Sequence, residues 1–154
     1  LRVADGGVIG ENDVILVASG LGGGTDLDRT SAWDDHHRVE HARALRNDVV
    51  VYGDQAGFFT IAAGLAGRTE LGIELARPGH DPGLGRRLLH QARRAVEPGS
   101  HLFAAVSPGN ARSLRSFLAA GFAPIGSEVI IDRSGLGDRS PTGPDRARSA
   151  QERR

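Results

Sequence analysis

The sequence predicts one α/β domain with a mixed β-sheet flanked by helices. Six segments have the short apolar or alternating pattern of strands, and three have apolar residues at helical spacing. Their order is strand, helix, three strands, helix, strand, helix, strand, which favours mixed strand directions in one sheet. A chain of 154 residues is long enough for one hydrophobic core.

The first half of the chain contains four of the predicted strands and one helix. NDVILVAS (12–19) is a short apolar run that predicts a strand. An amphipathic helix is expected over 33–47, because Val39, Ala42 and Leu45 recur at helical spacing. Three further strands are expected at 48–54, 57–65 and 69–77.

The second half alternates helices and strands. A helix is predicted over 84–96, with one face formed by Leu84, Leu88, Leu89, Ala92 and Val96. HLFAAVS (101–107) is mostly apolar and therefore predicts a central strand. The next helix is expected to begin after Asn110 as N-cap and to end at Gly121, with an apolar stripe of Leu114, Phe117 and Leu118. SEVIID (127–132) is the last predicted strand.

Composition divides the chain into three parts. Residues 1–30 are rich in glycine and include one strand, whereas residues 31–132 contain the other periodic segments and form the core. Residues 133–154 are polar, contain Gly and Pro, and lack apolar side chains that could dock on a core. We therefore expect a disordered tail there.

Charge and cysteine content limit the classes of function. Nineteen Lys and Arg balance nineteen Asp and Glu, so a nucleic acid or membrane partner is not expected. No apolar run approaches the ~18 residues of a membrane span, and nothing resembles a secretory signal. The absence of cysteine excludes a thiol nucleophile and a thiolate metal site, and it fits a cytoplasmic location.

Two motifs suggest other functions but lack their structural context. SGLGGGT (19–25) follows a strand, but no apolar-periodic helix follows it to receive a phosphate, which favours a flexible connector. HRVEH (37–41) matches the inverted zinc-peptidase pattern, and its two histidines share a helix face. The zinc would still need a third protein ligand, so no metal site is predicted.

HDPGLGRR (80–87) is the strongest candidate for ligand binding. It connects a predicted strand to a predicted helix, and Gly83 and Gly85 allow a ligand to approach the backbone closely. The start of the helix offers unpaired N–H groups and the positive end of the helix dipole, which favour a diphosphate. A tight turn alone would explain one glycine, but not two glycines together with a helix start and two arginines.

This loop is followed by SPGNARSLRSFLAAGF, which contains a strand end, an Asn-started helix and Gly-Phe at its close. Together, the loop at 80–87 and this segment resemble the acyl-CoA-binding region of the GNAT N-acetyltransferase superfamily. The loop pattern of that superfamily is Gln/Arg-x-x-Gly-x-Gly/Ala. The likeness runs over 48–131, and the chain more narrowly resembles an actinobacterial GNAT-like group. It implies a sheet splayed between its fourth and fifth strands, here 69–77 and 101–107, with acetyl-CoA in the gap.

The resemblance also implies roles for individual residues. The main chain of Leu75, Ala76 and Arg77 would bond the pantetheine arm. The N–H groups of Gly83, Leu84, Gly85 and Arg86 would hold the diphosphate, with the guanidinium of Arg86 or Arg87 nearby. Asn110 would contact pantetheine, and Ser113 or Phe117 would lie beside the thiol end.

The implied activity is acetyl-CoA-dependent transfer of an acetyl group to a primary amine of a small acceptor. Transfer would be direct, because no cysteine is present to form a covalent acetyl-enzyme. Glu70 and Glu74 lie on one face of their strand, and either could take the amine proton through water. The family more often uses the earlier position, which favours Glu70.

The chain departs from the family pattern at three positions, and two of them, Pro82 and Phe117, favour an alternative, a non-catalytic acyl-CoA-binding or regulatory module. His80 replaces the usual Arg or Gln, and Pro82 removes an N–H from the loop. Phe117 stands where many members have a Tyr that protonates departing CoA, and Phe cannot donate a proton.

The last predicted strand lacks the neighbouring strand that is usual in the family, so it needs another partner. Members of the family usually close with two strands after the Asn-started helix, but only 127–132 qualifies here. An uncovered strand edge is an aggregation hazard. We therefore expect a homodimer with this strand at or near the interface, and the strand at 12–19 is the other candidate partner.

Overall fold

The computed structural model describes residues 8–132. Glu11–Val129 forms one compact unit, to which the site belongs, and the described ends 8–10 and 130–132 belong to a second unit. The tail predicted over 133–154 lies outside the described residues.

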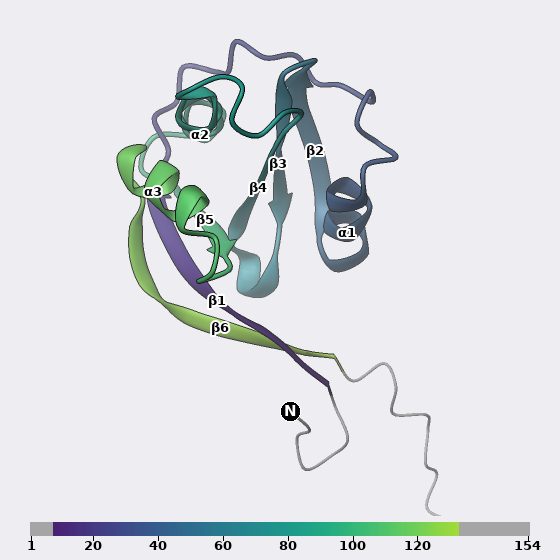
Figure 1. Ribbon diagram of the computed structural model, residues 1–154, viewed down its shortest axis with the longest axis vertical. Coiled ribbons are helices and arrows are strands. Elements are labelled where there is room, and N and C mark those ends of the chain that lie inside the picture. Colours follow the sequence, from purple (N-terminus) through teal and green to yellow (C-terminus); the bar gives the residue numbers. More distant parts are fainter. Residues whose placement is uncertain (1–7, 133–154) are drawn as a thin grey trace, which may run out of the picture. The chain divides into compact units, whose positions relative to one another are not determined.

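The observed elements follow the predicted order (Figure 1). The strands are β1 (Val8–Ser19), β2 (Asn47–Asp54), β3 (Gly57–Ala63), β4 (Thr69–Leu75), β5 (His101–Val106) and β6 (Ala123–Asp132). The helices are α1 (His37–Leu45), α2 (Leu84–Arg94) and α3 (Ala111–Ala119), with one turn of 3₁₀ helix at Leu65–Gly67.

The strands form one mixed sheet in the order β2-β3-β4-β5-β1-β6. β2, β3 and β4 are antiparallel neighbours, β4 and β5 are parallel, and β1 runs antiparallel to β5. The prediction of a mixed sheet with flanking helices is confirmed.

The parallel pair is short, and this opens the sheet. β4 pairs with β5 only over Thr69–Leu71, opposite Leu102–Ala104, although β4 continues to Leu75 and β5 to Val106. Beyond Leu71 the two strands therefore diverge. The splay predicted between the fourth and fifth strands is present.

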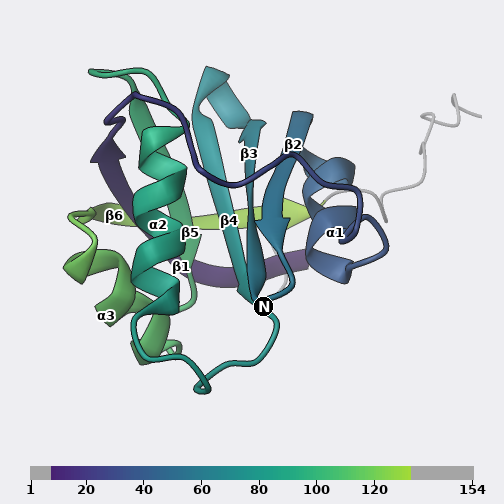
Figure 2. The same ribbon diagram turned by 90° about the horizontal axis from the view of Figure 1, so that it is seen from above.

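Helices cover both faces of the sheet (Figures 1 and 2). On one face, α2 and α3 bury a core that includes Leu16, Phe59, Leu89, Leu102 and Phe117. On the other face, α1 buries a smaller cluster of Val39, Val51 and Phe58, against which Trp33 packs. The predicted apolar faces are confirmed except at their ends, because Leu45 and Leu118 are 47% and 50% exposed.

The strand that pairs with β6 comes from the same chain. β1 lies between β5 and β6, so the N-terminal strand covers one edge of the last strand. Of the two partners considered for the last strand, a second copy of the chain and the strand at 12–19, the structure therefore confirms the second as a neighbour. β6 is the edge strand of the sheet, so its other edge has no neighbour among the described strands, and the homodimer stays a prediction.

Element boundaries differ from prediction where the chain changes direction. The helix expected over 33–47 begins only at His37, because residues before it form turns and the His36 side chain caps the helix by accepting the Arg38 N–H. It ends at Leu45, since Arg46 is already extended. β6 begins at Ala123, four residues before the predicted start, and pairs directly after the turn that follows α3.

Candidate functional site

Two adjoining cavities lie where β4 and β5 diverge. The helix-side cavity, about 180 Å³, lies between β4, α2 and α3, and it includes Leu75, Gly85, Arg112 and Ser116 in its lining. The gap cavity, about 250 Å³, lies between the strands themselves, and Leu71, Gly72, Ala105 and Val106 line it. Both cavities are lined by Arg38, Ile73, Asn110, Ser113 and Phe117. A ligand in the helix-side cavity can therefore meet one in the gap cavity.

The start of α2 presents free backbone donors. Gly83 is the N-cap with φ of +88°, a left-handed conformation that other residues adopt at a cost. The Leu84 N–H donates to the Asp81 carbonyl at 3.2 Å, so this predicted donor is already used. Among the described residues, the N–H groups of Gly83, Gly85 and Arg86 have no backbone acceptor.

Gly85 leaves open the space between α2, α3 and β4. A Cβ at this position would lie 3.6 Å from Ser116 Oγ and 3.9 Å from Leu75 Cδ1. Those are ordinary contacts, so the fold tolerates a small side chain there. Any longer side chain would extend into the helix-side cavity, as expected of a cradle for a ligand.

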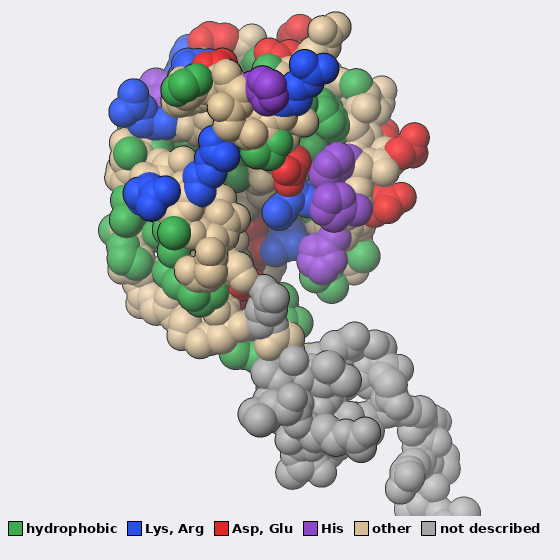
Figure 3. Space-filling view, viewed as in Figure 1, with side chains coloured by type: hydrophobic (Ala, Val, Ile, Leu, Met, Phe, Trp, Pro, Cys, Tyr) green, Lys and Arg blue, Asp and Glu red, His purple; other side chains and the backbone are tan. Residues whose placement is uncertain are grey.

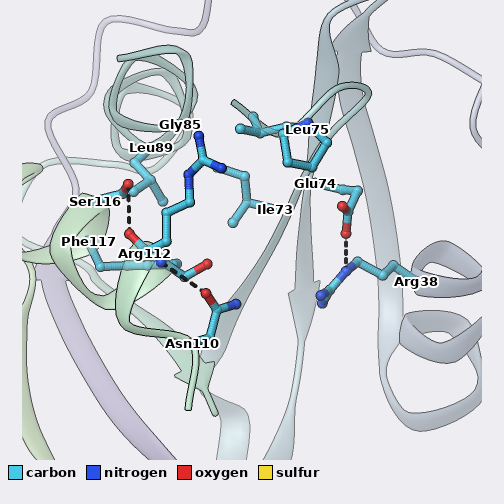
Figure 4. Close-up of a pocket in the computed structure, with 12 residues that line it drawn as sticks. Arg38, Ile73, Glu74, Leu75, Gly85, Leu89, Asn110, Arg112, Ser116 and Phe117 are labelled. Atoms are coloured by element: carbon cyan, nitrogen blue, oxygen red, sulfur yellow. Dashed lines mark hydrogen bonds and ion pairs between the residues drawn. The ribbon is translucent and has the colours of Figure 1, made fainter. Parts of the chain in front are cut away.

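The arginines near the start of α2 differ in whether they are already paired with an acidic side chain. Arg87 forms an ion pair with Asp81, which reduces its availability for a ligand. Within the part of the chain that the structure describes, neither Arg86 nor Arg112 has an acidic partner. Arg112 reaches from α3 across the helix-side cavity toward α2 (Figure 4), and its guanidinium lies 3.3 Å from where a Cβ at Gly79 would stand. Sequence analysis missed Arg112, because its direction depends on how α3 packs beside α2.

The open edge of β4 offers further backbone groups. The Ala76 N–H donates to the Ala56 carbonyl at 2.9 Å, on the β3 side. Backbone groups alternate in direction along a strand, so those of Leu75 and Ile73 face the gap. The predicted contact of Leu75 therefore fits this geometry, whereas the Ala76 N–H is already used within the sheet. Arg77 lies in the loop beyond β4, and its carbonyl accepts the His80 N–H at 3.3 Å.

The three residues predicted on α3 come together at the junction of the cavities. Asn110 caps the helix, and its Oδ1 accepts the Ser113 N–H at 3.1 Å. Phe117 is 3% exposed and packs edge-to-face on Phe122, with 5.0 Å between ring centroids. Phe117 therefore gives both cavities an apolar wall, and Ser113 lines both of them as well.

The two glutamates predicted as alternative bases have different surroundings. The Glu70 carboxylate pairs with Arg46 Nε at 2.5 Å and Arg68 Nη2 at 3.0 Å, and its side chain is only 11% exposed. It lines a separate cavity of about 10 Å³. Glu74 pairs with Arg38 of α1 and lines the helix-side cavity (Figure 4). Of the two glutamates, only Glu74 lines one of the two adjoining cavities.

The cluster around Glu70 is structural in character. Arg68 also pairs with Glu128 of β6 at 3.0 Å and lies over the Phe103 ring at 5.6 Å. The hydrogen bond to Glu128 raises the pKa of Arg68, with a further contribution from Glu70, against the opposing effect of burial. The cluster connects β4 to the end of α1 and to β6, and the carboxylates of Glu70 and Glu128 are both paired with arginines within it.

A third acid, Asp13, lines the gap cavity, and sequence analysis missed it. It lies on β1 one residue before Val14, which pairs with Val106 at the end of β5. The sequence signal was weak, because Asp13 reaches the site only when β1 pairs with β5. Ser107 lines the same cavity from the residue after β5.

The two alternative motifs do not form sites. Within residues 8–132, no group of three His, Asp or Glu side chains is arranged to hold a metal. The two histidines of the motif, His37 and His41, are exposed on α1, and Figure 3 shows a group of histidine side chains at the surface. The glycine run after β1 is a packed connector, since the Gly20 and Leu21 N–H groups bond Ser100 and Arg93 carbonyls. In the described part of the chain, no helix is long and apolar enough to cross a membrane.

Comparison with known proteins gives a likeness of fold. No family model matches the sequence, and no curated protein matches it. Among solved structures, an acetyltransferase of the GNAT family from Colwellia psychrerythraea matches with a TM-score of 0.50 at 12% identity. The match covers 80% of this chain but only 56% of that one. The mixed sheet, splayed between β4 and β5, has the GNAT fold.

Proposed function

We propose that this chain belongs to the GNAT superfamily and binds acetyl-CoA in the helix-side cavity. On this proposal it transfers the acetyl group to a primary amine that enters the gap cavity. The observation that carries the proposal is the junction of the two cavities, with free N–H donors at one end and an acid beside it. The fold likeness supports the same assignment.

The diphosphate would bind at the start of α2. The free N–H groups of Gly83, Gly85 and Arg86 lie at the positive end of the helix dipole, which stabilises an anion. Arg86 and Arg112 would add charge-assisted hydrogen bonds. The pantetheine arm would lie along the open edge of β4, bonding Leu75 and contacting Asn110 on the opposite wall.

The thioester would then lie near Ser113 and Phe117, where the cavities join. The amine nitrogen forms a bond to the thioester carbonyl carbon, the carbon–sulfur bond breaks, and CoA leaves as its thiolate or thiol. Glu74 would take the amine proton, directly or through one water. We prefer Glu74 to Glu70 because Glu70 lines a separate cavity of only about 10 Å³ and its carboxylate is paired with two arginines.

Phe117 supports one alternative, a module that binds acyl-CoA without turnover. Its ring cannot protonate a departing thiolate, and it occupies the floor of both cavities. A thiol with a pKa of about 8.5 leaves tolerably well unprotonated, and the Ser113 hydroxyl is a possible donor. Both readings require acetyl-CoA binding, and only turnover separates them.

Gly85→Val tests the binding site. Its side chain would project into the helix-side cavity and hinder a diphosphate from forming charge-assisted hydrogen bonds at the start of α2, which are worth about 1.5–3 kcal/mol each. Acetyl-CoA affinity, measured by calorimetry, should fall at least about tenfold, since 1.4 kcal/mol corresponds to a factor of ten. Gly83→Val is a poorer test, because its φ of +88° would strain any other residue.

Gly126→Val is the matched control. A Cβ at Gly126 meets nothing within 4 Å, and the residue lies on β6 outside both cavities. It should bind acetyl-CoA as the wild type does. Unchanged affinity in a folded Gly85→Val protein would contradict the acetyl-CoA assignment. CoA release with a panel of amines then distinguishes the enzyme from the binding module.

A further inference from the structure

Arg38 is the residue of α1 that lines both cavities. Its backbone is held in place, because its N–H donates to Nδ1 of the capping His36 at 3.2 Å and the next residue, Val39, is fully buried. Its side chain reaches from the helix toward the sheet (Figure 4). Arg38 therefore holds a cation at the junction of the cavities, where an acceptor amine would meet the thioester.

The ion pair with Glu74 leaves Arg38 able to bind a second anion. The contact runs through Nε, whereas a guanidinium carries five N–H donors. Arg68 of the same structure pairs with two carboxylates at once, those of Glu70 and Glu128, each at 3.0 Å. The side chain of Arg38 is 52% exposed, so a ligand carboxylate can reach its guanidinium and add to the pair in the same way.

The gap cavity suits a small and polar occupant. Its lining includes the polar residues Asp13, Ser107, Asn110 and Ser113, and Arg38 is the basic residue among the described residues that line it. Asp13 and Ser107 already take part in interactions within the structure, and no ligand contact is assigned to them. A volume of about 250 Å³ corresponds to roughly eight water molecules at about 30 Å³ each, which leaves room for a small amino acid.

We propose that the acceptor is a small amino acid, whose carboxylate binds Arg38 while its amino group lies beside Glu74. This rests on the proposed function, in which Glu74 takes the proton of the attacking amine. The charged groups of an amino acid lie a few bonds apart, and the Arg38–Glu74 pair presents the two opposite charges side by side. Each end of the ligand therefore meets the opposite charge, whereas an amine without a carboxylate satisfies only Glu74.

Calorimetry of acceptor binding tests the proposal without any turnover. The probes are L-alanine and β-alanine, each compared with its own amide, which has the same length and lacks the negative charge. The wild type should bind the better amino acid at least about tenfold more tightly than its amide, a difference of about 1.4 kcal/mol. Arg38→Gln should remove this preference, and Arg38→Lys, which keeps the charge, should retain part of it.

Arg43→Gln is the matched control, because Arg43 is an exposed arginine of the same helix that pairs with Asp34 and lines neither cavity. It should keep the preference for the amino acid. If turnover occurs, Arg38→Gln should lower the ratio of kcat/KM for the amino acid to that for its amide, and Arg43→Gln should not.

Three results would overturn the proposal. They are a wild type that binds the amino acids no more tightly than their amides, an Arg38→Gln protein that keeps the preference, and an Arg43→Gln protein that loses it. Failure of the wild type to bind acetyl-CoA would instead contradict the proposed function, which the separate acetyl-CoA titration reveals.

Discussion

Neutralising the two glutamates of β4 one at a time should have opposite consequences. Glu70→Gln removes the charge that two arginines share, whereas Glu74→Gln removes the acid that reaches the helix-side cavity. We expect Glu70→Gln to lower stability with little effect on the chemical step. Glu74→Gln should lower turnover and cost at most about 1 kcal/mol of stability, because its partner Arg38 is 52% exposed.

The size of the stability effect follows from burial. Removing one member of a buried ion pair costs about 3–5 kcal/mol. The lower end applies here, because the side chains of Arg46 and Arg68 remain 23% and 22% exposed and Arg68 keeps Glu128. A loss of about 3 kcal/mol lowers Tm by roughly 6–12 °C in a chain of this size.

The size of the kinetic effect follows from the role of the base. Loss of a general base typically costs about 10²-fold or more in rate, and part of this should return at higher pH as the amine loses its own proton. Urea unfolding gives the stabilities, and CoA release under saturating acetyl-CoA gives the rates. Glu40→Gln is the same substitution at an exposed position of α1, and it should alter neither the stability nor the rate. A Glu70→Gln protein of normal stability and low turnover, beside an active Glu74→Gln protein, would refute this assignment.

Two further changes test the electrostatics. Arg112→Gln should weaken acetyl-CoA binding about tenfold and reduce its salt dependence, since a charge-assisted bond to the diphosphate is lost; an unchanged affinity at low salt would remove Arg112 from the site. The hydrogen bond from Gln91, and then that from Arg94, lowers the pKa of Asp26 below 3.8. Its contribution to stability is therefore present above that pH and is lost as the pH falls through the lowered value. Asp26→Asn should flatten the pH dependence of urea unfolding below about pH 4, and an unchanged slope would contradict the shift.

Local patterns were sufficient to predict the elements and their order. The helices α2 and α3 have clear apolar stripes and an N-cap at Asn110, and the strands are bounded by Gly and Pro. The predicted ends of the elements were wrong where tertiary contacts determine the conformation of the chain. Trp33 has the spacing of a helical residue but packs on Phe58, with 5.0 Å between ring centroids, while the chain around it forms turns.

The partner of β6 could not be predicted from local pattern, because strand order is set by long-range pairing. β1 and β5 are separated by most of the chain, yet they pair from Val14 to Ser19. That pairing brings Asp13 to the gap cavity. In the same way, Arg112 reaches the start of α2 only because α3 packs beside it.

Glu70 and Glu74 show where prediction from sequence reaches its limit. Strand alternation correctly places both on one face, separated by about 13 Å at a rise of about 3.3 Å per residue. Glu70 lies where β4 is still paired with β5, opposite Phe103, and there the closed sheet and the flanking arginines enclose it. Glu74 lies beyond Leu71, where the parallel pairing has ended, and therefore borders open space. The residue at which the parallel pairing stops thus decides which glutamate is structural and which can meet a substrate. That residue depends on the register of two strands about 30 positions apart, which neither alternation nor side-chain type reveals.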